Sequence, residues 1–65
     1  MILKSCENKG YCVIFKAWLY VDIKECFFHV EFVDRNELKT NAYVYKNFKC
    51  ACDKYEMFAK LIKSM

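Results

Sequence analysis

Cysteine and histidine are the side chains of this sequence best suited to chemistry. Five cysteines occur, and His29 is the single histidine. A catalytic Cys–His pair needs both groups on one face and within hydrogen-bond reach. Cys26 lies three residues before His29, so on a strand the two side chains point to opposite faces. Cys12 becomes a diagonal neighbour of His29 in one register, with Glu31 alongside.

No other catalytic feature accompanies these residues. The chain has neither a phosphate-binding glycine loop nor a pair of carboxylates in an evident pocket. A small sheet with one helix also leaves little room for a substrate cleft. We therefore predict that His29 is a surface histidine between aromatic neighbours and that the protein is not an enzyme.

The cysteine spacing argues against a metal site. Cys50-x-Cys52 is shorter than the Cys-x₂₋₄-Cys knuckles of zinc sites. In an antiparallel meander, Cys6 and Cys12 would lie about 26 Å from the other three cysteines. The odd count and an N-terminus without the pattern of a secretory signal predict free thiols in a cytoplasmic protein. We expect neither a metal nor another cofactor.

Gly10, the only glycine, predicts the first turn. A three-residue loop at positions 8–10 would use its freedom to adopt a positive φ. In that register Cys6 faces Cys12, with Cβ atoms about 4.5–5.5 Å apart. We therefore predict that these two cysteines lie close together and form a disulfide only under oxidation.

The pattern of apolar residues indicates one α+β domain spanning residues 1–65. Alternation rich in Val, Phe and Tyr predicts four strands. Asp53 and Glu56 have the spacing of a capping box, which predicts a helix over residues 53–64. Tyr55, Phe58, Leu61, Ile62 and Met65 form its apolar stripe. The expected fold is a four-stranded antiparallel β-meander with one C-terminal amphipathic helix packed on one face. The predicted strands are residues 2–6, 11–20, 25–33 and 40–49.

The two faces of the predicted sheet are both apolar, which is the main functional signal. One helix can cover one face, and the face assigned to it is Phe15, Ala17, Leu19, Phe28, Val30, Phe32, Ala42, Val44 and Phe48. The face left open carries Ile14, Trp18, Tyr20, Phe27, His29, Tyr43 and Tyr45. Such a patch is larger than soluble monomers usually expose, and Trp and Tyr are enriched at binding hot spots. The open alternative is a solvated sheet held by cross-strand aromatic pairs, with Lys16, Glu25 and Glu31 among them.

Charge narrows the class of partner. Eleven basic and eight acidic residues give a net charge of +3. This falls short of the basic excess of a nucleic-acid binder, and it is the wrong sign for an acidic mimic of DNA. No apolar run approaches the roughly 18 residues that cross a bilayer.

We therefore predict a small protein-binding module. The predicted contact residues are Trp18, Tyr20, Phe27, His29, Tyr43, Tyr45 and Lys16. The partner is either another protein, for example a nucleic-acid-processing enzyme, or a second copy in a homodimer. A composition rich in Lys, Asn, Phe and Tyr and poor in Gly, Ala, Arg and Pro favours a phage or mobile-element inhibitor of a host defence nuclease, of the anti-restriction or anti-CRISPR type. A single-stranded nucleic-acid-binding sheet is the remaining alternative.

Overall fold

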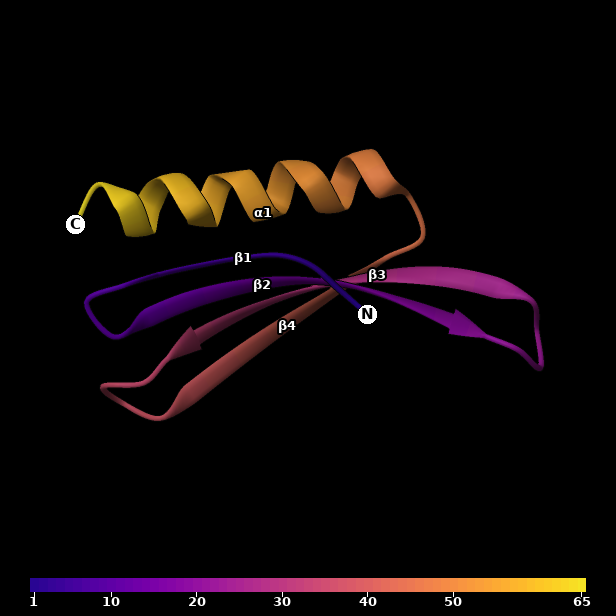
Figure 1. The fold of residues 1–65 in the computed structure, drawn as a ribbon, viewed down its shortest axis with the longest axis horizontal. Coiled ribbons are helices and arrows are strands. Elements are labelled where there is room, and N and C mark those ends of the chain that lie inside the picture. The colour runs from indigo at the N-terminus through magenta and orange to yellow at the C-terminus, as the bar shows by residue number, and fades with distance from the viewer.

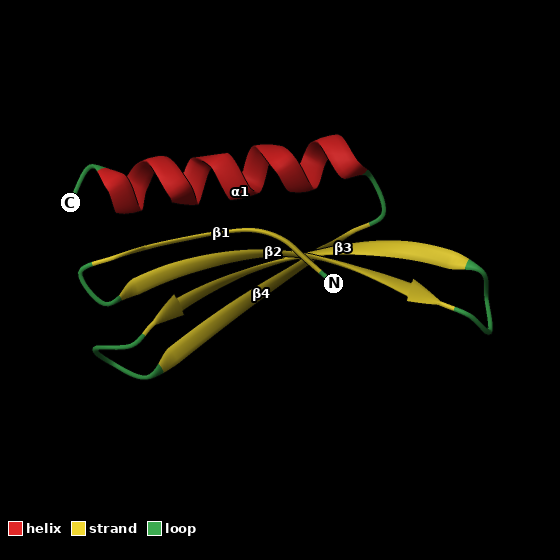
Figure 2. Ribbon diagram, viewed as in Figure 1, coloured by secondary structure: helices red, strands yellow, loops and turns green.

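A computed structural model describes residues 1–65 and confirms the α+β fold (Figure 1). The strands β1 (Ile2–Asn8), β2 (Tyr11–Tyr20), β3 (Glu25–Asp34) and β4 (Lys39–Tyr45) form one antiparallel sheet in that order. The helix α1 (Phe48–Lys63) follows and packs on one face. Figure 2 shows that no second layer covers the other face.

The predicted strand bounds hold for β2 and nearly for β3, whereas β1 is longer and β4 shorter than expected. β1 continues to Asn8 because the loop after it has only two residues. Lys9 and Gly10 have φ values of 51° and 84°. Positive φ at both central positions defines the type I′ turn, whose twist matches that of the flanking strands.

This shorter loop overturns the predicted pairing of two cysteines. Cys6 lies opposite Val13, and Glu7 lies opposite Cys12. Cys6 and Cys12 therefore point to opposite faces of the sheet, because the register is shifted by one residue. Cys6 packs against the core beneath α1, and all five cysteines are free thiols.

The predicted faces of β4 are also reversed. Tyr43 lies opposite Val30 and Tyr45 opposite Phe28, both on the side that α1 covers. Ala42 and Val44 therefore lie on the open face instead of in the core. The β3–β4 turn sets this register: Asp34 Oδ1 accepts hydrogen bonds from the backbone N–H groups of residues 36 and 37, and Leu38 has a φ of 57°.

The helix begins five residues before the predicted start. Asn47 is the N-cap, and its side-chain oxygen accepts a hydrogen bond from the backbone N–H of Cys50 at 3.1 Å. Asp53 and Glu56 are therefore in the helix and do not form its capping box. Phe48 belongs to the first turn of α1 and not to a strand. There it stacks on Phe15 with ring centroids 5.7 Å apart.

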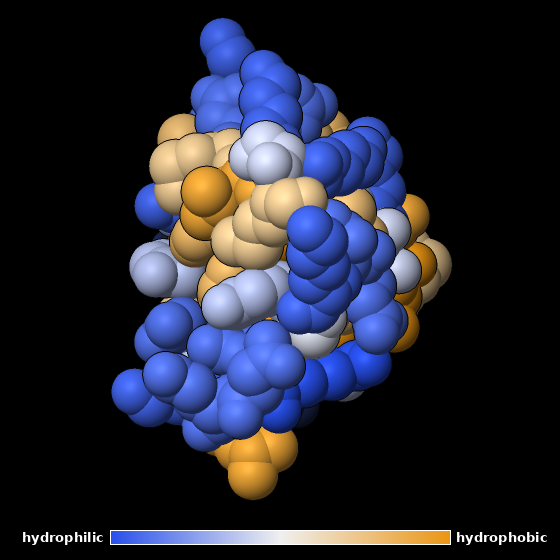
Figure 3. Space-filling model, turned by 90° about the vertical axis from the view of Figure 1, so that its left-hand side faces the viewer, coloured by the Kyte–Doolittle hydropathy of each residue, from blue (hydrophilic) through white to orange (hydrophobic).

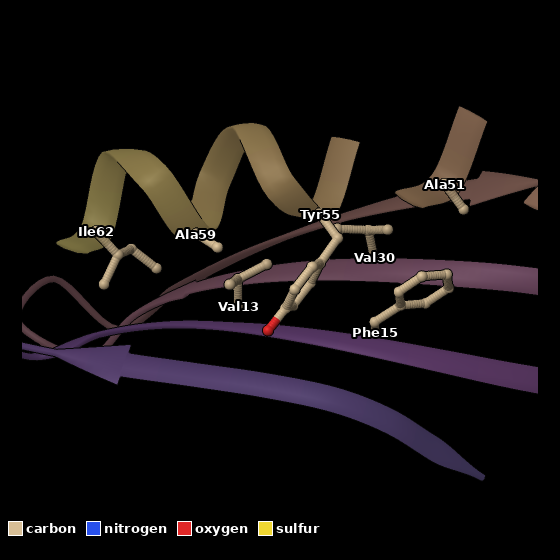
Figure 4. Packing of buried hydrophobic residues seen from close by; sticks show 7 residues of the cluster. All are labelled: Val13, Phe15, Val30, Ala51, Tyr55, Ala59 and Ile62. Carbon is tan, nitrogen blue, oxygen red and sulfur yellow. The ribbon is translucent and has the colours of Figure 1, made fainter. Parts of the chain in front are cut away.

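The core lies between α1 and the two central strands. Two alanines, Ala51 and Ala59, let the helix approach the sheet closely, and Tyr55 fills the space between them (Figure 4). The predicted apolar stripe was partly wrong, since Leu61 and Met65 are exposed. The buried cluster consists of Val13, Phe15, Val30, Ala51, Tyr55, Ala59 and Ile62.

Candidate protein-binding surface

Residues 18–27 form a two-stranded projection that we call the arm. The end of β2 and the start of β3 pair with each other there, at Trp18–Phe27, Leu19–Cys26 and Tyr20–Glu25. Neither outer strand continues alongside them: β1 reaches only Ala17, through Met1, and β4 ends opposite Phe28. In Figure 1 the arm extends beyond both outer strands and beyond the helix.

The arm is uncovered because the helix is shorter than the strands beneath it. α1 has 16 residues and is about 24 Å long, whereas the 10 residues of β2 span about 33 Å. The C-terminal end of α1 is held at the β1–β2 turn, where Asn8 Nδ2 donates to the carbonyl oxygen of Ile62 at 2.9 Å. From that end the helix reaches Phe28, which packs on Phe48, and stops there.

Apolar side chains lie on both faces and at the tip of the arm. Trp18 is 49% exposed on the open face, and Leu19 is 66% exposed on the face that α1 covers elsewhere. Val21, at 76%, and Ile23 project from the tip. Figure 3 views the molecule from the opposite end, where hydrophilic surface surrounds a smaller hydrophobic area. Contiguous apolar exposure of this kind is typical of interaction sites.

Aromatic contacts hold the open face of the arm together. Tyr20 and Phe27 meet edge to face with ring centroids 5.1 Å apart. Trp18 contacts His29 edge to face at 6.3 Å. An isolated two-stranded hairpin is at best marginally stable in water, so these cross-strand contacts are what order the arm.

The charged groups next to the arm are paired among themselves. Lys16 Nζ lies 2.8 Å from Glu31 on the open face, and Lys46 Nζ lies 3.5 Å from Glu25, in the pair of the arm next to its tip. Lys46 also lies 5.6 Å from the centroid of the Phe27 ring. The aromatic surface therefore carries little uncompensated charge.

His29 lies at the root of the arm, opposite Lys16 and Val44 on the neighbouring strands. Its Nε2 atom is buried and has no hydrogen-bond partner. A buried ring nitrogen without a hydrogen-bond partner costs free energy whether it is a donor or an acceptor.

The structure brings together five of the seven predicted contact residues. Trp18, Tyr20 and Phe27 form the open face of the arm, with His29 and Lys16 at its root. The prediction that Tyr43 and Tyr45 lie on the open face is wrong, since both lie beneath α1. Tyr43 packs on Phe58 with ring centroids 5.6 Å apart.

Sequence reasoning missed the tip of the arm and its second face. The predicted core face includes Leu19, and Val21 and Ile23 fall between the second and third predicted strands. The signal was present in the lengths of the predicted elements, because a 12-residue helix covers about 18 Å while a 10-residue strand spans about 33 Å.

The predicted neighbourhood of Cys12 and His29 is wrong. Cys12 lies opposite Val33, whereas His29 lies opposite Lys16, four residues further along β2. Four strand residues correspond to about 13 Å, beyond hydrogen-bond reach. Burial raises the pKa of the Cys12 thiol, and the charge of Arg35 opposes this rise only in part. A thiol with a raised pKa is a poor nucleophile near neutral pH.

The surface hollows lie elsewhere on the molecule. All three are lined by residues of α1, joined in one case by Lys4 and in another by Tyr45, and none includes a residue of the arm. No three side chains of His, Cys, Asp or Glu come close enough to share a metal ion. The single helix lacks the length and apolar character needed to span a bilayer.

Comparison with known proteins gives no relative. No family model matches the chain, and neither a curated protein nor a solved structure is detectably similar to it. The arm and the open face therefore have to be interpreted from their own geometry.

Proposed function

We propose that this protein is a non-enzymatic protein-binding module whose contact surface is the arm together with the adjoining open face of the sheet. The observation that carries the proposal is the exposure of Trp18, Leu19, Val21 and Ile23 on a hairpin that no other element covers. Exposed Trp and Tyr bury large areas on binding and lose little side-chain entropy.

The shape of this surface favours a macromolecule over a small ligand. Small-molecule sites are concave, and no hollow lies on the arm. A projecting hairpin with apolar faces instead fits a complementary protein groove or a second flat sheet.

Charge favours a protein over a nucleic acid. A single-stranded nucleic acid needs free cationic groups beside the stacking aromatics. Here Lys16, two residues before Trp18 on the same face, and Lys46, which lies 5.6 Å from the centroid of the Phe27 ring, are paired with Glu31 and Glu25. The narrower prediction, that the partner is a host defence nuclease, rests on the small size of the chain, its lack of catalytic apparatus and its composition.

Two variants with matched exposure test the proposal. Trp18→Ala removes an arm side chain that is 49% exposed, and Leu61→Ala removes a side chain of α1 that is 50% exposed. We expect protein association, measured by nuclease-treated affinity capture and by light scattering, to be lost with the first change and kept with the second. If neither variant alters any association, the arm is not a binding surface.

A further inference from the structure

The arm has the properties of a surface that is covered by an identical surface. The argument rests on the proposed function, since it names the partner of the same site. Three observations bear on it: the charge balance around the arm, the apolar area that it offers, and the lengths of its unpaired edges.

The side-chain charges on and around the arm cancel, and the N-terminal ammonium, which donates to the carbonyl oxygen of Ala17, adds one positive charge at its root. Three basic residues and three acidic residues lie there, although the whole chain has a net charge of +3. Specific binding to an unlike partner usually relies on complementary charge. A surface with nearly balanced side-chain charges offers little complementary charge to an unlike partner. Two copies can still approach through it, because most of the positive excess lies elsewhere in the chain. The six residues are Lys16, Asp22, Lys24, Glu25, Glu31 and Lys46.

The area is adequate for a two-fold interface. Half-exposed Trp18 and Tyr20 each offer on the order of 100 Å² of apolar surface. With Val44, Phe27 and the tip of the arm, the apolar total is on the order of 500 Å². The paired charges around it extend the surface toward the roughly 800 Å² that each partner buries in a standard interface.

The backbone edges of the arm are too short to hold a partner strand on their own. Each edge runs for about three residues between the end of an outer strand and the turn. Pairing along an edge therefore contributes few hydrogen bonds, and the side chains of the open face offer more apolar area. The arrangement that uses most of the exposed area is face-to-face packing of two sheets.

We propose that a second copy of this chain covers the arm, in a homodimer whose two open faces pack around a two-fold axis. In a two-fold interface the same surface patch of each copy contacts the other, so every contact occurs twice. The Trp18, Tyr20 and Phe27 side chains of the two copies then cover one another.

Trp18 is the only tryptophan, so it reports on this contact directly. Light scattering and Trp18 emission are measured on the wild type from about 1 μM to about 1 mM, which spans weak to moderate affinities. We expect the mass to rise from 7.9 kDa to twice that value and the emission to shift to shorter wavelength over the same range. A monomer mass throughout overturns the proposal.

Three variants locate the interface. We expect Trp18→Thr and Tyr20→Glu each to weaken dimerisation tenfold or more. Thr keeps a high strand propensity, so Trp18→Thr tests the contact even if Tyr20→Glu disorders the arm. Leu61→Glu, at a matched exposure on α1, leaves the dimer intact. A dimer that resists both arm variants, or that Leu61→Glu weakens equally, overturns the proposal.

The same variants separate this inference from the proposed function. If the wild type is monomeric but retains another protein that Trp18→Thr loses, the second-copy inference is wrong and the arm is still a protein-binding surface. If the wild type is monomeric and retains nothing, both proposals fail.

Discussion

Tyr20 and Phe27 meet edge to face across the arm, with ring planes at 85° and centroids 5.1 Å apart. This contact lies outside the buried cluster, since neither ring packs against a core residue beneath α1. The arm is therefore ordered by contacts within itself, and its stability is separable from that of the core.

Removal of one ring tests this separation. We expect Tyr20→Ala, studied under monomeric conditions, to raise amide hydrogen exchange across residues 18–27 while the amides of Val13 and Val30 stay protected. The loss of one aromatic pair costs the arm about 1 kcal/mol, which is large for a hairpin without lateral neighbours. Equal acceleration of exchange in the core would show that arm and core open as one unit.

The start of α1 gives a second prediction. Asn47→Ala removes the side-chain acceptor for the Cys50 N–H and should lower the free energy of unfolding by about 1 kcal/mol. Asp53→Ala is the matched control, because Asp53 is exposed within the helix and should change it by less than about 0.5 kcal/mol. Urea unfolding measures both values. A larger loss of stability with Asp53→Ala than with Asn47→Ala would indicate that the helix begins at Asp53, as the capping box predicts.

The thiols should differ in their reactivity. Cys26 and Cys50 are exposed, whereas Cys12 is buried and its pKa is raised. With limiting iodoacetamide near pH 8, mass spectrometry should find label first on the exposed pair and last on Cys12. Mild oxidation should give no Cys6–Cys12 disulfide, because the two side chains lie on opposite faces of the sheet. If that disulfide forms in the folded chain, the β1–β2 loop has three residues and Cys6 lies opposite Cys12.

Stability should fall in alkaline solution. Burial raises the pKa of Cys12, and burial together with the nearby Cys6 and Cys12 raises the pKa of Tyr55. The unfolded chain then loses these protons at a lower pH than the folded chain, so the folded state is penalised as the pH rises through about 9 and then 10. We expect Tyr55→Phe to reduce the loss measured by urea unfolding between pH 8 and 11. If Tyr55→Phe loses as much stability as the wild type between pH 8 and 11, the burial of the Tyr55 hydroxyl group is contradicted.

The strands were predictable because alternation and turn chemistry agree with the fold. Apolar residues recur at every second position within each strand, as Val13 and Phe15 do in β2. This pattern predicts strands and places their apolar side chains on one face, which the helix covers. Gly10 correctly marked the first turn, but its presence alone does not separate a two-residue loop from a three-residue loop. The difference of one residue decided which cysteines share a face.

The phase of β4 and the start of α1 were missed for a common reason. Phe48 continues the alternation of Ala42 and Val44, so a strand pattern extended into residues that form the first helical turn. The small residues Ala51 and Ala59 carried the opposite information, since they fit where a helix approaches a sheet that bears large rings. Phe15 supplies such a ring in the buried cluster, and only the packed arrangement reveals the match.

The difference in length between α1 and the central hairpin divides the chain into a part that is constrained by packing and a part that is not. Residues beneath the helix must fit one another, so substitutions there are constrained by volume and shape. Residues 18–27 are free of that constraint and need only preserve a strand pair. Insertion of two residues in each strand of the arm would extend its reach by about 7 Å and keep the facing of every side chain. The arm can therefore change in length and chemistry while the supporting layer stays the same, as a loop does on a rigid scaffold.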